Sequence, residues 1–153
     1  MSTIQSSITF ATPIDAPLEQ VRDAITDPAW HKWLPFLSAT EYEGTAAGSR
    51  RICTMASPDP QMNGYVLQET IEGIDEGAGR LSYAIQNPPM PVENLRGSVE
   101  ASQNEAGQVI ATWTATFSSS AEALAQSRPL MLHMYQLGLQ GLEAYAQEQA
   151  KVA

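Results

Sequence analysis

A succession of short alternating segments followed by one long helical tail constrains this chain more than any other feature. Between residues 38 and 117, apolar and polar residues alternate, and glycine-rich or proline-rich turns separate the segments. Alternation with a period of two is typical of β-strands with one buried face, and short connections favour antiparallel neighbours. From 121 to 149 the composition favours a helix with one apolar stripe. The pattern therefore predicts an α+β fold.

Seven strands and three helical segments are expected. The first strand carries Ile4, Ile8 and Phe10, one short helix carries Leu18 and ends at Asp27-Pro28, and a second short helical piece carries Trp30. Further strands are expected near 38–43, 49–56, 64–73, 80–87, 93–102 and 108–118. No repeat, linker or low-complexity segment divides the sequence, so we expect residues 1–153 to form a single domain.

Composition excludes several classes of function. The chain has 17 acidic and 8 basic residues and a net charge of −9, which disfavours nucleic-acid partners and anionic membrane surfaces. One cysteine and two histidines supply no metal-ligand spacing, so we expect neither a metal nor a cofactor. No apolar segment is long enough for an integral membrane protein, and the N-terminus lacks a secretion signal, which predicts a cytoplasmic protein.

Strand parity predicts which side chains the last helix covers. Tyr65, Leu67 and Ile71 share one face of their strand, and neighbouring strands add further aromatic and aliphatic side chains. On the helix, Gly138 indicates either a close approach to the sheet or room for a ligand, and the nearby methionines favour the ligand. The residues expected to line a ligand cavity are Trp33, Tyr65, Leu67, Ile85, Trp113, Met131, Met134, Tyr135 and Gly138.

Glu69 is the most informative single residue, because it shares its face with apolar side chains. A buried carboxylate requires a partner, and we expect Arg50 on the neighbouring strand to face inward while Arg51 faces solvent. Three roles remain open for Glu69: a structural ion pair, recognition of a ligand carbonyl or hydroxyl, and acid/base catalysis. Glu69, Arg50 and Tyr83 are therefore the candidate catalytic residues. His133 falls on the polar stripe of the last helix and is expected to be solvated.

A set of local motifs also resembles a known superfamily. The matching segments are Ile14-Asp-Ala-Pro17, Trp30-His-Lys-Trp33-Leu-Pro35, Gly48-Ser-Arg50, Glu69 with Ile71, Leu81-Ser-Tyr83, Pro91-Val-Glu-Asn94, and Trp113 with Phe117. In order and spacing they resemble the START-like (SRPBCC) superfamily, which includes Bet v 1-type and polyketide cyclase/dehydrase-like proteins. The resemblance implies a helix-grip fold, in which a curved antiparallel sheet and a long C-terminal helix enclose a pocket for hydrophobic molecules.

The expected function is binding of a small hydrophobic or aromatic molecule, lipid-like or polyketide-like, between the sheet and the last helix. No nucleophile, base and orienting group can be assembled from the sequence, so binding is favoured over catalysis. The alternative is a cofactor-independent cyclase or dehydratase in which Glu69 moves protons. The sequence leaves open whether any reaction is catalysed, which ligand is bound and how many copies assemble.

Overall fold

In a computed structural model, residues 2–152 of the chain are described, and they form seven strands, two helices and one short 3-10 turn. The strands are β1 (Ile4–Ile14), β2 (Leu37–Tyr42), β3 (Arg50–Met55), β4 (Val66–Asp75), β5 (Arg80–Ile85), β6 (Glu93–Gln103) and β7 (Val109–Ser119). The helices are α1 (Leu18–Thr26) and α2 (Ala121–Val152), and the 3-10 turn is η1 (Trp30–Lys32). The expected elements are all present, with ends displaced by one to a few residues.

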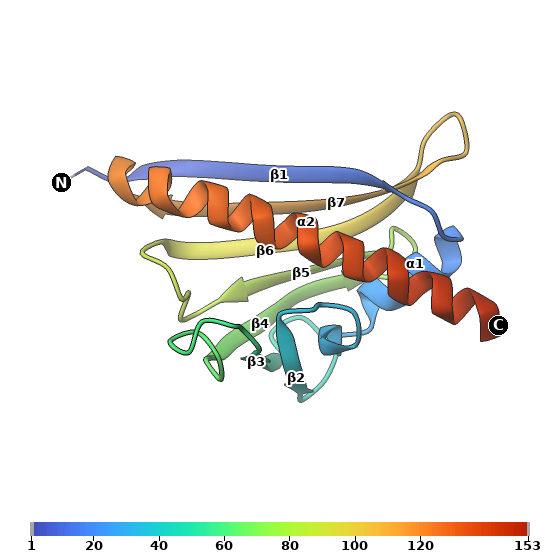
Figure 1. The fold of residues 1–153 in the computed structure, drawn as a ribbon, viewed down its shortest axis with the longest axis horizontal. Coiled ribbons are helices and arrows are strands. Elements are labelled where there is room, and N and C mark those ends of the chain that lie inside the picture. The colour runs from blue at the N-terminus through green and yellow to red at the C-terminus, as the bar shows by residue number, and fades with distance from the viewer. Residues whose placement is uncertain (1, 153) are drawn as a thin grey trace.

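The strands form one antiparallel sheet in the order β1-β7-β6-β5-β4-β3-β2. Figure 1 shows α2 crossing one face of this sheet obliquely, from the start of β1 towards α1. The sheet is open, because β1 and β2 pair only on one side. This arrangement confirms the predicted α+β helix-grip fold. It also places the inner faces of the middle strands opposite the underside of α2.

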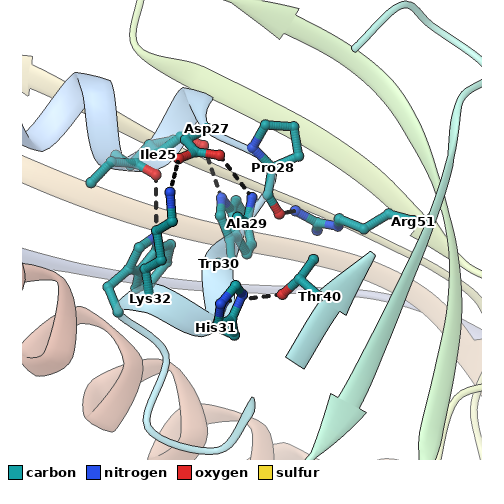
Figure 2. Close-up of polar contacts among 11 residues, drawn as sticks. Ile25, Asp27, Pro28, Ala29, Trp30, His31, Lys32, Thr40 and Arg51 are labelled. Atoms are coloured by element: carbon teal, nitrogen blue, oxygen red, sulfur yellow. Dashed lines mark hydrogen bonds and ion pairs between the residues drawn. The ribbon is translucent and has the colours of Figure 1, made fainter. Parts of the chain in front are cut away.

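The segment between α1 and β2 is held by polar contacts around Asp27. The Asp27 carboxylate accepts hydrogen bonds from the Ala29 backbone N–H at 3.0 Å and from the Lys32 ammonium at 3.0 Å (Figure 2). Burial alone would raise the pKa of Asp27, but these hydrogen bonds and the lysine charge lower it below its usual value. Together they tie η1 to the end of α1, and Trp30 within this segment is buried.

The helix α2 begins after a serine that caps it and continues to the end of the described chain. The Ser120 hydroxyl accepts a hydrogen bond from the Ala123 backbone N–H at 3.1 Å, as an N-cap does. Pro129 lies within α2, and the helix continues without a break on both sides of it. His133 is exposed, as its place on the polar stripe predicted.

Two glycines of α2 allow it to lie against the other elements. A Cβ atom added at Gly141 would lie 2.2 Å from the backbone oxygen of Trp33, and one added at Gly138 would lie 2.7 Å from the Trp113 ring and 2.9 Å from the Leu34 side chain. Only a residue without a side chain permits this approach. Of the two explanations that the sequence allowed for Gly138, the structure supports close approach.

Aromatic side chains fill much of the space between sheet and helix. The Trp113 and Tyr135 rings stack at 4.4 Å between centroids, and Trp30 packs edge-on against Trp113 at 5.8 Å. Trp33 completes the cluster at 5.0 Å from Trp30. All three tryptophans are buried, so they form the centre of the hydrophobic core. Within residues 2–152, no helix is long and apolar enough to cross a membrane.

Candidate ligand-binding site

A cavity of about 60 Å³ remains between the aromatic cluster, the middle strands and α2. It is lined by Trp30, Leu34, Phe36, Leu37, Arg51, Cys53, Met55, Leu67, Glu69, Tyr83, Ile85, Pro89, Met90, Leu95, Trp113, Met131, Met134 and Tyr135. An engineered dry cavity of about 150 Å³ accommodates benzene, and pockets for larger ligands reach about 300–1,000 Å³. The cavity as it stands is therefore too small even for the small aromatic or lipid-like molecule that the sequence analysis predicts.

The cavity reaches towards the surface where its lining is only half-buried. Phe36, Ile85, Pro89, Met90 and Met134 have this intermediate exposure, whereas most of the other lining residues are buried. We call these five residues the rim. Two of them are methionines, whose unbranched side chains change conformation at low cost. The rim is thus the part of the lining that can move without disturbing the buried core.

An ion pair between Arg51 and Glu69 supplies the charged groups of the lining. Nη2 of Arg51 lies 2.6 Å from Oε1 of Glu69, and Nε donates to the same oxygen at 2.8 Å. Nη1 donates to the carbonyl of Pro28 at 3.1 Å, as Figure 2 shows. The guanidinium also lies 4.4 Å from the centroid of the Trp30 ring, a cation–π contact. Arg51 therefore joins β3 and β4 to the segment before η1.

The expectation that Arg50 faces inward is wrong, and so is the expectation that Arg51 faces solvent. In the antiparallel register, Arg51 is directly opposite Glu69, whereas Arg50 is opposite Thr70. Residues directly opposite one another in a sheet share a face, so Arg51 and Glu69 both point to the interior. Arg50 is exposed and lies 3.9 Å from the carboxylate of Glu43. The buried arginine that Glu69 requires is therefore Arg51.

The tyrosine hydroxyls of the site remain protonated. Burial raises the pKa of Tyr83 well above its usual value, and burial raises that of Tyr135 as well. The Tyr83 oxygen accepts a hydrogen bond from the Trp113 indole N–H at 2.9 Å. Tyr83 fits against β6 because its neighbour there is Gly97, where a Cβ atom would lie 2.4 Å from the Tyr83 oxygen. Tyr83 is held rigidly as a neutral hydrogen-bonding group.

Cys53 lines the cavity as a neutral thiol. Burial raises its pKa from 9.0 to about 12, the charge of Glu69 adds to that effect, and Arg51 opposes it. The reactive form of cysteine is the thiolate, which this environment suppresses near neutral pH. Cys53 therefore acts as a small hydrophobic residue in this lining.

Most of the residues predicted to line a cavity do so. Those found in the lining are Leu67, Glu69, Tyr83, Ile85, Trp113, Met131, Met134 and Tyr135. Their role in binding a ligand stays a prediction. Arg50, Trp33, Tyr65 and Gly138 lie outside the lining.

These departures have separate physical causes. Trp33 is buried in the aromatic cluster, and its indole N–H donates to the Ala24 carbonyl at 3.1 Å. The Tyr65 hydroxyl donates to the Asn87 carbonyl at 2.7 Å at the end of β4. The space next to Gly138 is occupied by the side chain of Trp113. Each of these residues therefore contributes to the scaffold around the cavity.

Sequence reasoning also missed several lining residues. Arg51, Cys53 and Met55 alternate along β3 and all are buried, so the two apolar partners could have identified the inner face. Ile52 on the other face obscured this signal. Pro89 and Met90 lie in the turn between β5 and β6, where no periodicity indicates direction. Turn residues of this kind require coordinates to place them.

No group of three or more potential metal-ligating side chains comes together within residues 2–152.

The family described as polyketide cyclase / dehydrase and lipid transport matches residues 5–147. No curated protein matches the chain in sequence. The family match covers nearly the whole of the sheet, the rim and α2.

Solved structures share this fold. An uncharacterized protein from Bacillus thuringiensis has a TM-score of 0.77 and 22% sequence identity, covering 92% of this chain and 98% of that one. A protein from Thermobifida fusca has a TM-score of 0.72 and 26% identity, covering 95% and 93% of the two chains. A truncated norcoclaurine synthase from Thalictrum flavum has a TM-score of 0.71 and 12% identity, with 94% of each chain covered. Likeness at such identities concerns the fold.

Proposed function

The chain belongs to the polyketide cyclase / dehydrase and lipid transport family, and from this premise we propose that it binds a small hydrophobic molecule between the sheet and α2. The observation that carries the proposal is an apolar cavity with one buried ion pair in its lining and a half-buried rim. Aromatic, lipid-like and polyketide-like molecules are the classes of guest that such a lining suits.

Entry of a guest requires the cavity to enlarge. Met90 and Met134 stand on the rim, and Met131 extends the methionine lining inward. Rotation of these side chains opens space without breaking a hydrogen bond, whereas the stacked Trp113 and Tyr135 rings form a firmer wall. We therefore expect binding to be accompanied by rearrangement of methionines rather than by movement of strands.

Ligand binding can be tested with a matched pair of variants on one helix. Met134 lies on the rim, and Leu137 lies three residues later on an exposed part of α2 outside the lining. We expect naphthalene derivatives and long-chain alcohols to raise the melting temperature of the wild-type protein. Met134→Trp should reduce this shift strongly, whereas Leu137→Trp should preserve it. Native mass spectrometry of freshly purified protein would identify any guest that co-purifies.

Two results would contradict the proposal. One is a melting temperature that no member of the panel raises. The other is an equal loss of the shift in both tryptophan variants, which would place binding away from the rim. Methyl NMR signals of the methionines should also respond to the added guest, and unchanged signals from Met131 and Met134 would argue against the proposed location.

A second candidate is a cyclase or dehydratase that uses the same cavity. The observation that favours it is the presence of Glu69 and the neutral Tyr83 in one lining. Glu69 would accept a proton from an acidic carbon, and Tyr83 would donate a hydrogen bond to the resulting enolate. In this candidate, Arg51 rather than the predicted Arg50 is the arginine that pairs with Glu69. If Glu69→Gln retains ligand affinity and abolishes turnover of a polycarbonyl substrate, the enzymatic function is supported.

A further inference from the structure

The lining of the cavity is electrically balanced. Arg51 and Glu69 are its two charged side chains, and they are in contact at 2.6 Å. A charged guest would leave an uncompensated charge among apolar side chains, which is costly. The charge balance therefore favours a neutral guest over a carboxylate or an ammonium ion.

The hydrogen bonds of this ion pair are unequally distributed. Each of the three guanidinium nitrogens of Arg51 lies within 3.1 Å of a protein oxygen. On Glu69, both contacts fall on Oε1, and among residues 2–152 no hydrogen bond to Oε2 is found. The Glu69 side chain is only 5% exposed. Oε2 thus belongs to a largely buried side chain and has no protein donor among the described residues, so a donor on a guest would stabilise the complex.

Few neighbouring groups can supply that donor. Apart from Arg51 and the tryptophan indoles, the side-chain donors in the lining are the hydroxyls of Tyr83 and Tyr135 and the weak Cys53 thiol, and within residues 2–152 neither hydroxyl is hydrogen-bonded to Oε2. Each nitrogen of Arg51 already has an acceptor, so the unmet demand at the ion pair itself is for an O–H or N–H group. An ether or ester oxygen would bring a second acceptor towards Oε2 and would not meet that demand.

We propose that the cavity selects neutral hydroxyl compounds, alcohols or phenols, which donate their O–H to Oε2 of Glu69. This inference rests on the proposed function, because it specifies the chemistry of the guest in the same cavity. The apolar body of the guest lies against the methionines and the Trp113–Tyr135 stack, and the hydroxyl points to the ion pair. Specificity then comes from one acceptor, while affinity comes mainly from apolar contacts.

The test compares three probes of similar size: 2-naphthol, 2-methoxynaphthalene and 2-naphthoate. At about pH 7 the naphthol is neutral, because phenols ionise near pH 10. Isothermal titration calorimetry on the wild-type protein should give a dissociation constant for 2-naphthol that is about 10-fold to 100-fold lower than that of the ether, as expected for a hydrogen bond to a charged group. The naphthoate should bind more weakly than the naphthol.

A matched pair of glutamate variants locates the acceptor. Glu69→Gln should reduce the preference for naphthol over the ether towards unity. Glu72→Gln alters a glutamate of the same strand whose carboxylate faces the exposed Arg96 at 3.6 Å, and it should leave the preference unchanged. Where Glu69→Gln does not fold, the order of the three probes on the wild-type protein decides the question alone.

The outcomes separate this inference from the proposed function. Equal affinity for the naphthol and the ether would overturn the selection of hydroxyl compounds while leaving hydrophobic binding intact. Tighter binding of 2-naphthoate would overturn the charge argument. Absence of binding by all three probes would overturn both the inference and the proposed function.

Discussion

Removal of the buried arginine is expected to cost far more stability than removal of its exposed neighbour. Arg51 is 1% exposed and Arg50 has a side chain that is 61% exposed, although the two residues are adjacent in β3. We therefore compare Arg51→Met with Arg50→Met. Both changes remove one positive charge and replace it with the same flexible apolar side chain, so that the difference between them reports the position of the charge.

The magnitude follows from the contacts of each residue. Arg51→Met leaves the Glu69 carboxylate buried without its cation and removes the hydrogen bond to the Pro28 carbonyl. Breaking such a buried pair from one side lowers the free energy of unfolding by about 3–5 kcal/mol. The Arg50–Glu43 pair, at 3.9 Å on the surface, is worth at most about 1 kcal/mol.

Urea denaturation followed by tryptophan fluorescence measures both values, since all three tryptophans are buried. The double variant Arg51→Met with Glu69→Leu removes both charges and should recover most of the loss, because an apolar pair requires no desolvation of ions. Equal destabilisation by Arg50→Met and Arg51→Met would refute the reasoning. So would a double variant less stable than Arg51→Met alone.

Four further variants test other parts of the structure. Gly138→Ala and Gly141→Ala should each lower the melting temperature, although alanine is favoured over glycine by about 1 kcal/mol within a helix. The loss should be larger for Gly141→Ala, because its Cβ would meet a backbone oxygen. A higher melting temperature would contradict the close approach. Because burial raises the pKa of Cys53, its contribution to stability is complete below about pH 9 and is lost as the pH rises towards about 12. In urea titrations, the stability of the wild-type protein relative to Cys53→Ser should therefore fall over that pH range. A difference in stability that does not depend on pH would contradict this prediction. Pro129→Ala should raise the melting temperature, because it restores a backbone donor inside α2; a lower value would indicate that the proline is required there.

Strand periodicity was sufficient to predict the α+β class and much of the inner face, whereas the helix-grip arrangement was implied by the resemblance to a known superfamily. Leu81 and Tyr83, for example, share a parity that places them inside, and both are buried. Register was harder, because the pairing of β3 with β4 decides between Arg50 and Arg51, and alternation alone does not fix that pairing. Reading β3 from Cys53 and Met55 would have chosen Arg51.

The size of the cavity could not be predicted from sequence patterns. Strand parity predicts that Trp113 points inward, and the apolar stripe of the last helix predicts the same of Tyr135, but their stacking is a property of three-dimensional packing. Because the two rings are in contact, they fill space that the sequence analysis assigned to a ligand. Gly138 was ambiguous for the same reason, since a missing side chain is equally consistent with free space and with a close neighbour.

The glycine contacts of α2 separate two regions of the interior, which differ in how freely their side chains can be substituted. Around Gly138 and Gly141 the helix backbone is fixed against Trp113 and Trp33, so substitutions there must be compensated in the partner element. Around Met131 and Met134 the neighbours are a cavity and its rim. Substitutions at Met131 and Met134, by engineering or by evolution, can therefore change the size of the ligand that fits without altering how α2 packs against the sheet.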